Sequence, residues 1–142
     1  MAISQAMCTS FKAEILDEQH DLAADTIKVA LYTSSATLGA GTTAYSTSNE
    51  ISGTGYTAGG NTLTISTNPT NATSGTTAFL SFSDTTWASS TITARGALIY
   101  KSGVTYASFA VLDFGADKSS SNSTFKVEFP TASDTTAILR IG

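Results

Sequence analysis

The segment Thr26-Ile-Lys-Val-Ala-Leu-Tyr-Thr33 decides the fold class, because its large apolar side chains recur with a period of two. Ile27, Val29 and Leu31 fall on one face of an extended chain, and Lys28 falls on the other face. This spacing is typical of a half-buried β-strand and does not fit the 3.6-residue period of a helix. The segment therefore predicts a strand over residues 26–33.

The same alternation continues through the second half of the chain. In the segment 124–129 the two phenylalanines and the valine share one face and the charged residues lie opposite, and the segment 137–141 repeats the pattern. Lys101-Ser-Gly103 fits a short hairpin loop. About seven or eight strands separated by Gly, Ser and Asn clusters indicate a sandwich or a barrel, and the fold class that we predict is mainly β, an antiparallel β-sandwich. The predicted strands are 26–33, 49–52, 62–67 (closed by Pro69), 78–83, 90–101, 105–114, 124–129 and 137–141.

One α-helix is expected in the N-terminal stretch, residues 1–22. This stretch is rich in charge and has no glycine; Met7, Phe11 and Ile15 recur at intervals of four, and Ser4 can serve as the N-cap. A helix of three to four turns would pack on or beside a sandwich formed by residues 26–142. No linker divides the chain, so residues 1–142 are expected to form a single domain. The expected core consists of Phe11, Ile15, Val29, Leu31, Leu98, Phe109, Val111, Phe125, Val127 and Leu139.

The sequence contains few charged residues and many residues with a hydroxyl group. The 142 residues include 25 Thr and 20 Ser, and charged residues make up 13% of the chain, against about 25% in a typical globular protein. Threonine suits a solvent-facing position on a strand better than it suits a helix. With 41% hydrophobic residues and a net charge of only −4, the chain is expected to fold.

Several classes of function are disfavoured by the same composition. The seven basic residues are scattered and the sequence pI is near 4.6, so no basic patch for nucleic acid is expected. No apolar run reaches the roughly 18–20 residues of a membrane-spanning helix, and the N-terminus lacks the pattern of a signal peptide. We therefore expect no membrane partner, and a protein that is made in the cytosol and is either left or packaged there. A single cysteine, Cys8, allows no internal disulfide.

Two side chains were weighed as catalytic groups. His20 is the only histidine and stands among Asp17, Glu18 and Asp21, where no nucleophile can be named for it. It is therefore expected to be a solvated imidazole at the end of the helix. Cys8 lies on the apolar stripe of the helix, which predicts a packed thiol. We predict no catalytic residue and no enzyme activity.

The remaining short motifs also favour structural roles. Gly53-Thr-Gly-Tyr-Thr-Ala58 has the letters of a dinucleotide-binding loop, but a turn and a strand follow it, so a glycine-rich turn is expected. Asp113 and Asp117 have too few neighbouring oxygen donors for a calcium loop, and no metal or cofactor is predicted. Trp87, in a predicted connection, is interpreted as an anchor to the core in preference to a partner-facing aromatic.

Five stretches together resemble a family of small virion proteins of tailed bacteriophages, and the resemblance covers nearly the whole chain. It is carried by the segments Ser10–Leu16, Ile27–Gly39, Glu50–Gly60, Thr91–Tyr100 and Val111–Gly115, the last followed by Phe129-Pro130. The resemblance implies a structural component of the particle without enzymatic activity, located in the virion after synthesis in the host cytoplasm.

Two positions in the particle are compatible with this resemblance. The first is a capsid decoration, or cement, subunit that binds neighbouring major capsid proteins. The second is a tail or neck component, such as a small fibre, knob or adaptor. Repeated weak contacts of many copies suit polar, weakly charged interfaces, which favours the decoration subunit. The expected partners are the major capsid protein or other virion proteins, together with further copies in a homo-oligomer.

The candidate contact surfaces are the helix and the loops of residues 34–62. The helix concentrates acidic charge that can complement a basic patch, and the loops have few apolar anchors, so they are expected to be mobile unless a neighbour holds them. The predicted protein-contact residues are Tyr45, Tyr56, Trp87, Asp17 and Asp21.

Overall fold

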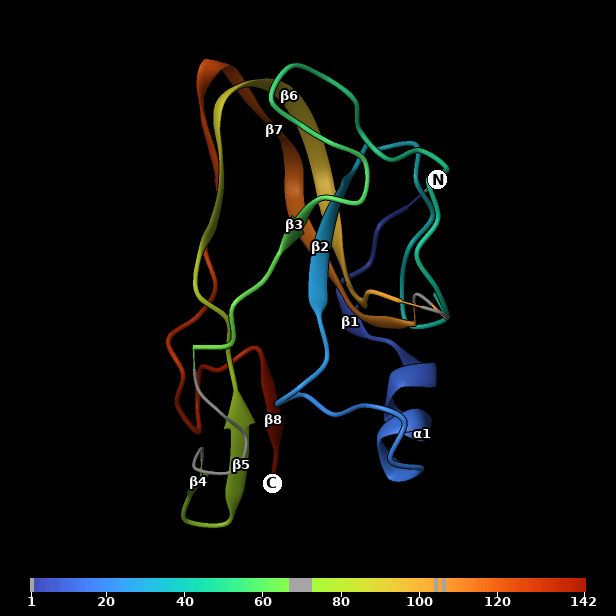
Figure 1. Cartoon of the computed structure of the whole chain (residues 1–142), viewed down its shortest axis with the longest axis vertical. Helices are drawn as coiled ribbons and strands as arrows, with labels where there is room; N and C mark the ends of the chain where they lie inside the picture. Colours follow the sequence, from blue (N-terminus) through green and yellow to red (C-terminus); the bar gives the residue numbers. More distant parts are fainter. Residues whose placement is uncertain (1, 67–72, 104, 106) are drawn as a thin grey trace.

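A computed structural model confirms a mainly β chain with two antiparallel sheets and one short helix (Figure 1). It describes residues 2–66, 73–103, 105 and 107–142. One sheet has the strand order β1-β7-β6-β2-β3 and the other the order β4-β5-β8, in an open, sandwich-like arrangement. The elements are β1 Ala6–Met7, α1 Thr9–Leu16, β2 Ile27–Tyr32, β3 Asn61–Thr62, β4 Thr73–Ser74, β5 Thr77–Leu80, β6 Thr85–Lys101, β7 Ser108–Val127 and β8 Leu139–Ile141.

The β6–β7 hairpin consists of the two longest described strands, of 17 and 20 residues. The two strands pair from Tyr100↔Ser108 to Thr85↔Val127, and Figure 1 shows them arching over the top of the molecule, so that each strand contributes to both layers. The register shifts at four places along this ladder. Such bulges add residues on one strand and increase its bend, which lets one hairpin turn from one layer into the other.

The predicted separate strands 105–114 and 124–129 are one continuous strand, β7. The polar run between them was interpreted as a connection, but its hydroxyl groups pair with those of β6: Ser90 Oγ lies 2.7 Å from Ser120 Oγ, and Thr93 Oγ1 lies 2.8 Å from Ser119 Oγ. The placement of Trp87 in a connection was wrong for the same reason, since it lies within β6. Serine and threonine here hold strands together instead of ending them.

The other strand predictions are confirmed in part. β2 falls within the predicted 26–33, β8 within 137–141, and the Lys101-Ser-Gly103 loop begins the β6–β7 connection. The strand predicted at 49–52 is reduced to an isolated bridge between Tyr32 and Glu50. The strand predicted at 62–67 is reduced to β3 and a bridge between Ile65 and Phe82; Thr67 and Pro69 at its predicted end lie outside the described residues.

The N-terminal helix is shorter than predicted. α1 covers Thr9–Leu16, and its N-cap is Cys8 instead of Ser4. The residues before it are extended, because β1 pairs with Ala110 and Val111 of β7 and so satisfies its backbone groups on a sheet edge. The helix ends at Leu16 with Asp17 as its C-cap, and the next residue, Glu18, has a left-handed φ of 58°.

Nine of the ten predicted core residues are buried, and the tenth, Ile15, is half-buried. β2 is buried on both faces: Ala30 and Tyr32 are as inaccessible as Val29 and Leu31. The sheet face that carries Tyr32 is covered by the loop of residues 34–60, which alternation within the strand could not reveal. None of the described helices is long and apolar enough to cross a membrane.

Candidate interaction surfaces

The loop of residues 34–60 is held together by the carboxylate of Glu50. Glu50 Oε1 accepts hydrogen bonds from the hydroxyl of Tyr56 at 2.6 Å and from the backbone N–H of Gly59 at 2.7 Å. Its other oxygen, Oε2, accepts the hydroxyl of Tyr45 at 2.7 Å. Hydrogen bonds to an ionised acceptor are stronger than neutral ones. One side chain therefore ties three points of the loop together.

The two tyrosines connect this carboxylate to the strands below. The Tyr45 ring stacks on Tyr100 of β6 with centroids 4.5 Å apart, and the Tyr56 hydroxyl oxygen accepts the backbone N–H of Leu31 in β2 at 3.0 Å. Burial, reinforced by the hydrogen bonds to Glu50, raises the pKa of both phenols above the usual value. Both tyrosines thus serve as neutral donors within the fold.

Two glycines allow the loop to lie directly on the sheet. Gly60 has a φ of +72°, and a Cβ there would stand 1.7 Å from the carbonyl oxygen of Val29. Gly55 has a φ of +84°, and its Cβ would stand 2.9 Å from Cα of Ser90. The motif that begins at Gly53 is a turn, with the N–H of Tyr56 donating to the Gly53 carbonyl, as predicted. The chain itself therefore supplies contacts that hold this loop on the sheet.

Trp87 packs beneath this loop. Its ring lies 5.9 Å from Tyr56 and 6.1 Å from Phe125, and the residue is only 4% exposed. This low exposure agrees with the interpretation, made from the sequence, that Trp87 is an anchor to the core. The structure therefore brings Tyr45, Tyr56 and Trp87 into one connected group, in which the tyrosines keep partly exposed surface.

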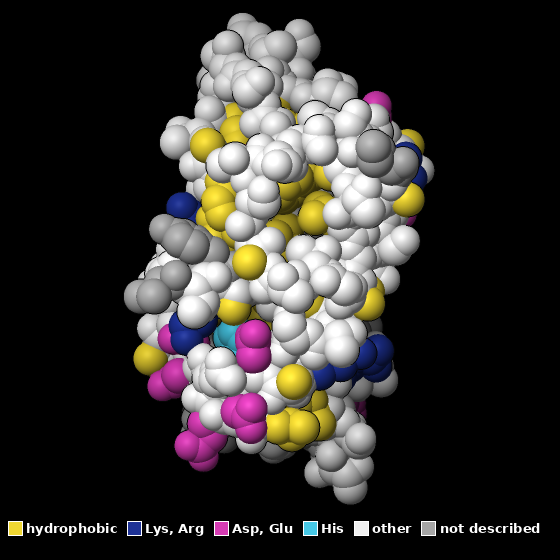
Figure 2. Space-filling view, turned by 90° about the vertical axis from the view of Figure 1, so that its right-hand side faces the viewer, with side chains coloured by type: hydrophobic (Ala, Val, Ile, Leu, Met, Phe, Trp, Pro, Cys, Tyr) yellow, Lys and Arg dark blue, Asp and Glu magenta, His cyan; other side chains and the backbone are white. Residues whose placement is uncertain are grey.

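The loop and the N-terminal segment enclose a hollow of about 750 Å³. Its floor includes Tyr32 and Leu38, and the walls consist of small and hydroxyl-bearing residues with no charged residue among them. Figure 2 looks onto the side on which this loop lies and shows a hollow with hydrophobic side chains at its base. The surface is suited to a neutral, polar contact.

Asp17 and Asp21 lie apart from the aromatic group, beside α1. Both are exposed; Asp17 follows the last residue of the helix, and Asp21 Oδ1 accepts the backbone N–H of Ala23 at 3.0 Å. Acidic side chains gather at this lower end of the molecule in Figure 2. Tyr45 and Tyr56 thus lie on one surface and Asp17 and Asp21 on another, while Trp87 is buried beneath the first.

His20 is buried, which corrects the expected solvated imidazole. Its side chain is 1% exposed, its Nε2 lies 2.6 Å from Glu14 Oε2, and its ring lies 4.9 Å from Phe11. The imidazole folds back over the helix because the chain reverses after Glu18, in a left-handed conformation. His20 therefore attaches the segment after the helix to the helix itself.

Lys101 fixes the same segment to β6. Its Nζ lies 3.1 Å from Asp25 Oδ2 and donates to the carbonyl oxygen of Gln19 at 2.8 Å. Residues 19 and 101 are far apart in sequence, and no local pattern signals this contact. Cys8, at the start of α1, is buried, and burial raises the pKa of its thiol. A raised pKa opposes thiolate formation, so Cys8 is a packed thiol.

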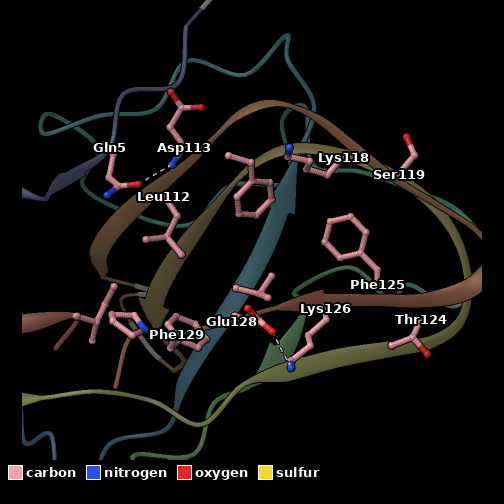
Figure 3. Close-up of a pocket in the computed structure, with 14 residues that line it drawn as sticks. Gln5, Leu112, Asp113, Lys118, Ser119, Thr124, Phe125, Lys126, Glu128 and Phe129 are labelled. Carbon is pink, nitrogen blue, oxygen red and sulfur yellow. Dashed lines mark hydrogen bonds and ion pairs between the residues drawn. The ribbon is translucent and has the colours of Figure 1, made fainter. Parts of the chain in front are cut away.

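A groove of about 570 Å³ runs along the open edge of the sandwich, between the two halves of β7 (Figure 3). Phe114 and Phe125 line it, with ring centroids 6.3 Å apart. At the rim, Lys126 Nζ lies 2.9 Å from Glu128 Oε1 and 3.2 Å from Asp84 Oδ2, and these two contacts raise the pKa of Lys126.

Asp113 and a bulge close the upper part of this groove. Asp113 Oδ1 lies 3.2 Å from Arg95 Nε and accepts the N–H of Gly115, so its pKa is lowered. Asp113 pairs with Gly96 and Lys118 with Ala94, so five steps of β7 oppose two steps of β6. A bulge of this size interrupts the edge and prevents a regular added strand.

The described residues contain no group of three or more His, Cys, Asp and Glu side chains that could hold a metal ion. The clearest sequence signal that was missed is Glu50, the one charged residue between Lys28 and Asp84. A single carboxylate between Tyr45 and Tyr56, in a stretch otherwise free of charge, indicates a buried acceptor for hydroxyl groups. The chain is a mainly β protein whose surfaces differ in polarity. No family model, curated protein or solved structure matches this chain.

Proposed function

We propose that this chain is a non-enzymatic structural protein of a tailed-bacteriophage virion, located in the particle, and that it acts as a capsid decoration subunit. In this role several copies bind neighbouring major capsid proteins, or other virion proteins, and stabilise the head. The proposal starts from the five sequence segments that resemble this family, of which three overlap the strands β2, β6 and β7 and one contains Glu50.

One observation carries the proposal: the side chains that could take part in catalysis instead hold parts of the fold together or pack in the core. Glu50 holds the loop of residues 34–60, His20 and Lys101 hold the segment after α1, and the Cys8 thiol is packed in the core. An active site requires such groups to be poised near a substrate. Here their geometry serves rigidity, which suits a protein that is bound by its neighbours.

The surface chemistry supports many weak contacts. Ser and Thr make up nearly a third of the sequence, and the hairpin arch and the walls of the hollow are lined with them. Polar interfaces with little charge are individually weak, but their effect multiplies when a lattice presents many equivalent sites. A decoration subunit works in this way.

A tail or neck component, such as a small fibre, knob or adaptor, is the second candidate. The molecule is elongated, and its ends differ: one carries α1 and the acidic residues, the other the hydroxyl-rich arch (Figures 1 and 2). Unlike ends suit head-to-tail contacts in a ring around an axis. Such contacts would place the chain at the tail or neck.

The copy number per particle tests the proposal. Particles of the phage that encodes this chain would be purified and the chain quantified by mass spectrometry against the major capsid protein. Hundreds of copies are expected for a decoration subunit, whereas about three to twelve would assign it to the tail or neck, as symmetric rings are that small. Absence from the particle would overturn the virion assignment altogether.

A further inference from the structure

The lower end of the molecule contains a small cleft that is lined only by apolar residues. It lies between the end of α1 with the segment after it and the sheet β4-β5-β8, and has a volume of about 100 Å³. This is close to the size of one aliphatic side chain. The lining residues are Ile15, Leu22, Ala78, Phe79, Leu80, Leu139 and Ile141.

One exposed hydrophobic side chain lines this cleft, and a second follows a lining residue in the sequence. Ile141 lines it and is 56% exposed, and Leu16, next to the lining residue Ile15, is 84% exposed. They are the two large hydrophobic residues that the described part of the chain leaves exposed. Single exposed apolar residues are common on protein surfaces, but one that lines an apolar cleft is typical of a contact site.

Three acidic residues, which we call the acidic rim, stand close in the sequence to residues that line the cleft. Asp17 and Glu18 follow Leu16 directly, and Asp21 precedes the lining residue Leu22. In the described structure neither Asp17 nor Glu18 has an ion-pair partner, and the last turn of α1 has no basic residue. The carboxyl end of a helix carries partial negative charge, so acidic side chains there are unfavourable until a cation approaches.

The acidic rim is held in place before any partner arrives. His20 contacts Glu14, and Lys101 contacts Asp25 and Gln19, so the segment that carries Asp21 is fixed at both ends. Lys101 is thereby occupied within the fold. Arg140, which lies between two lining residues of β8, donates to the carbonyl oxygen of Asp134 instead.

We propose that this cleft, with its acidic rim, binds a basic segment of a partner protein that inserts one aliphatic side chain between flanking lysines or arginines. An isologous contact with a second copy of this chain is disfavoured, because it would place the acidic rim against itself. The identity of the partner as a virion protein rests on the proposed function, whereas the chemistry of the cleft does not.

The first test uses the full chain and a capped peptide, Lys-Lys-Leu-Leu-Lys-Lys, as the probe. Amide chemical shifts of the labelled protein would be recorded during titration at low and high salt. We expect changes at residues 15–22, 78–80 and 139–141 that weaken in high salt, where charges are screened within about 3 Å at 1 M. A peptide with Glu in place of Lys should cause no change at these residues.

Matched variants distinguish binding at the cleft from a general effect of the negative charge of the protein. The pair Asp17→Lys with Glu18→Lys should weaken peptide binding at least tenfold, and Leu16→Asp should also weaken it. Asp117→Lys, at an exposed position in the β7 bulge, changes the net charge but lies away from the cleft and should leave binding within twofold. Unfolding curves of all variants would show that they fold.

Three results would overturn the proposal: no shift changes at the cleft, equal losses for the Asp117 control, or self-association of the wild-type chain that Leu16→Asp abolishes. The last would assign the cleft to a second copy. A separate arm measures occupancy on particles stripped of the protein. If the wild-type chain rebinds and the Leu16→Asp chain rebinds equally, the cleft proposal fails and the virion function stands. If the peptide binds at the cleft but no particle takes up the wild-type chain, only the virion function fails.

Discussion

Two hydroxyl-rich regions of this molecule are ordered by different means. The loop of residues 34–60 depends on one carboxylate, Glu50, and on close backbone contact at Gly60. The arch of the β6–β7 hairpin depends on many separate contacts between serine and threonine side chains, such as Ser90 with Ser120. A region that depends on one or two residues should be lost after a single substitution, and we call this concentrated support. A region that depends on many separate contacts, which we call distributed support, should lose stability in small steps.

The largest effect is expected for Gly60→Ala. A Cβ at this position would stand 1.7 Å from the Val29 carbonyl oxygen, and the φ of +72° is unfavourable for alanine. Because the opposing atom is backbone in β2, an inner strand of the sheet, relief requires the loop to leave the sheet. We expect a loss of about 3 kcal/mol or more in the free energy of unfolding, measured by urea denaturation.

Gly75→Ala is the matched control for this substitution. Gly75 also has a positive φ, +57°, but a Cβ there would meet nothing within 4 Å. Its loss should be only about 1 kcal/mol, the cost of the backbone conformation alone. Equal losses at the two positions would show that the loop does not lie closely on β2.

Glu50→Gln is expected to have the next largest effect. The amide keeps the size of the side chain but loses the charge and one of the two acceptor oxygens that Tyr45 and Tyr56 use. Hydrogen bonds to charged groups contribute about 1.5–3 kcal/mol each, so a loss of about 2–3 kcal/mol is expected in urea denaturation. Tyr45→Phe, which removes one donor and keeps the charge, should cost about half as much, and the reverse order would exclude Glu50 as the centre of this group.

The same group predicts a loss of stability at alkaline pH. The pKa of Tyr45 and the pKa of Tyr56 are both raised in the folded chain, mainly by burial and then by the bonds to Glu50. The unfolded chain releases these protons near pH 10, the ordinary value, while the folded chain retains them. Stability is therefore fully present below pH 10 and falls as pH rises above it.

This dependence is checked by urea denaturation between pH 8 and pH 11, a range of about three units around the ordinary tyrosine pKa. The Tyr45→Phe variant should show a shallower decline above pH 10, because one of the two phenols no longer titrates. A wild-type curve that is flat, or that rises above pH 10, would contradict the hydrogen-bond network around Glu50.

The two regions also show which parts of the fold follow from sequence. β2, most of β6 and nine of the ten core positions could be predicted, since alternation within a strand is a local property. The helix was extended too far because the pairing of Met7 with Ala110 joins residues that are distant in the sequence. Nothing near Met7 records that a sheet edge is available to it.

The same holds for the candidate contact residues: what depends on the local sequence could be predicted, and what depends on distant residues could not. Asp17 and Asp21 were predicted as acids on an exposed face of the helix, because the concentration of charge is visible locally; both are exposed, although they follow α1. The burial of His20 depends on a chain reversal at Glu18 and on Lys101, which approaches from β6. The serine-rich run within β7 was misinterpreted as a connection because single-residue tendencies of serine favour turns, whereas its partner hydroxyls are presented by another strand.

The smallest effects are expected in the hairpin arch. Ser90 is buried, and its hydroxyl contacts Ser120 Oγ at 2.7 Å and the Ser123 carbonyl oxygen at 3.0 Å. Ser90→Ala should cost about 1 kcal/mol, because it leaves buried polar atoms without this partner. Thr93→Ala removes the exposed contact with Ser119 and should cost only about 0.3 kcal/mol, since water replaces the lost bond.

The double variant Ser90→Ala with Thr93→Ala tests whether support in the arch is distributed. If each contact acts separately, the two losses in the free energy of unfolding should add to within about 0.5 kcal/mol. A combined loss that approaches that of Gly60→Ala would mean that the arch fails as one unit. The hairpin would then depend on a concentrated support, as the loop of residues 34–60 does, and the contrast between the two regions would no longer hold.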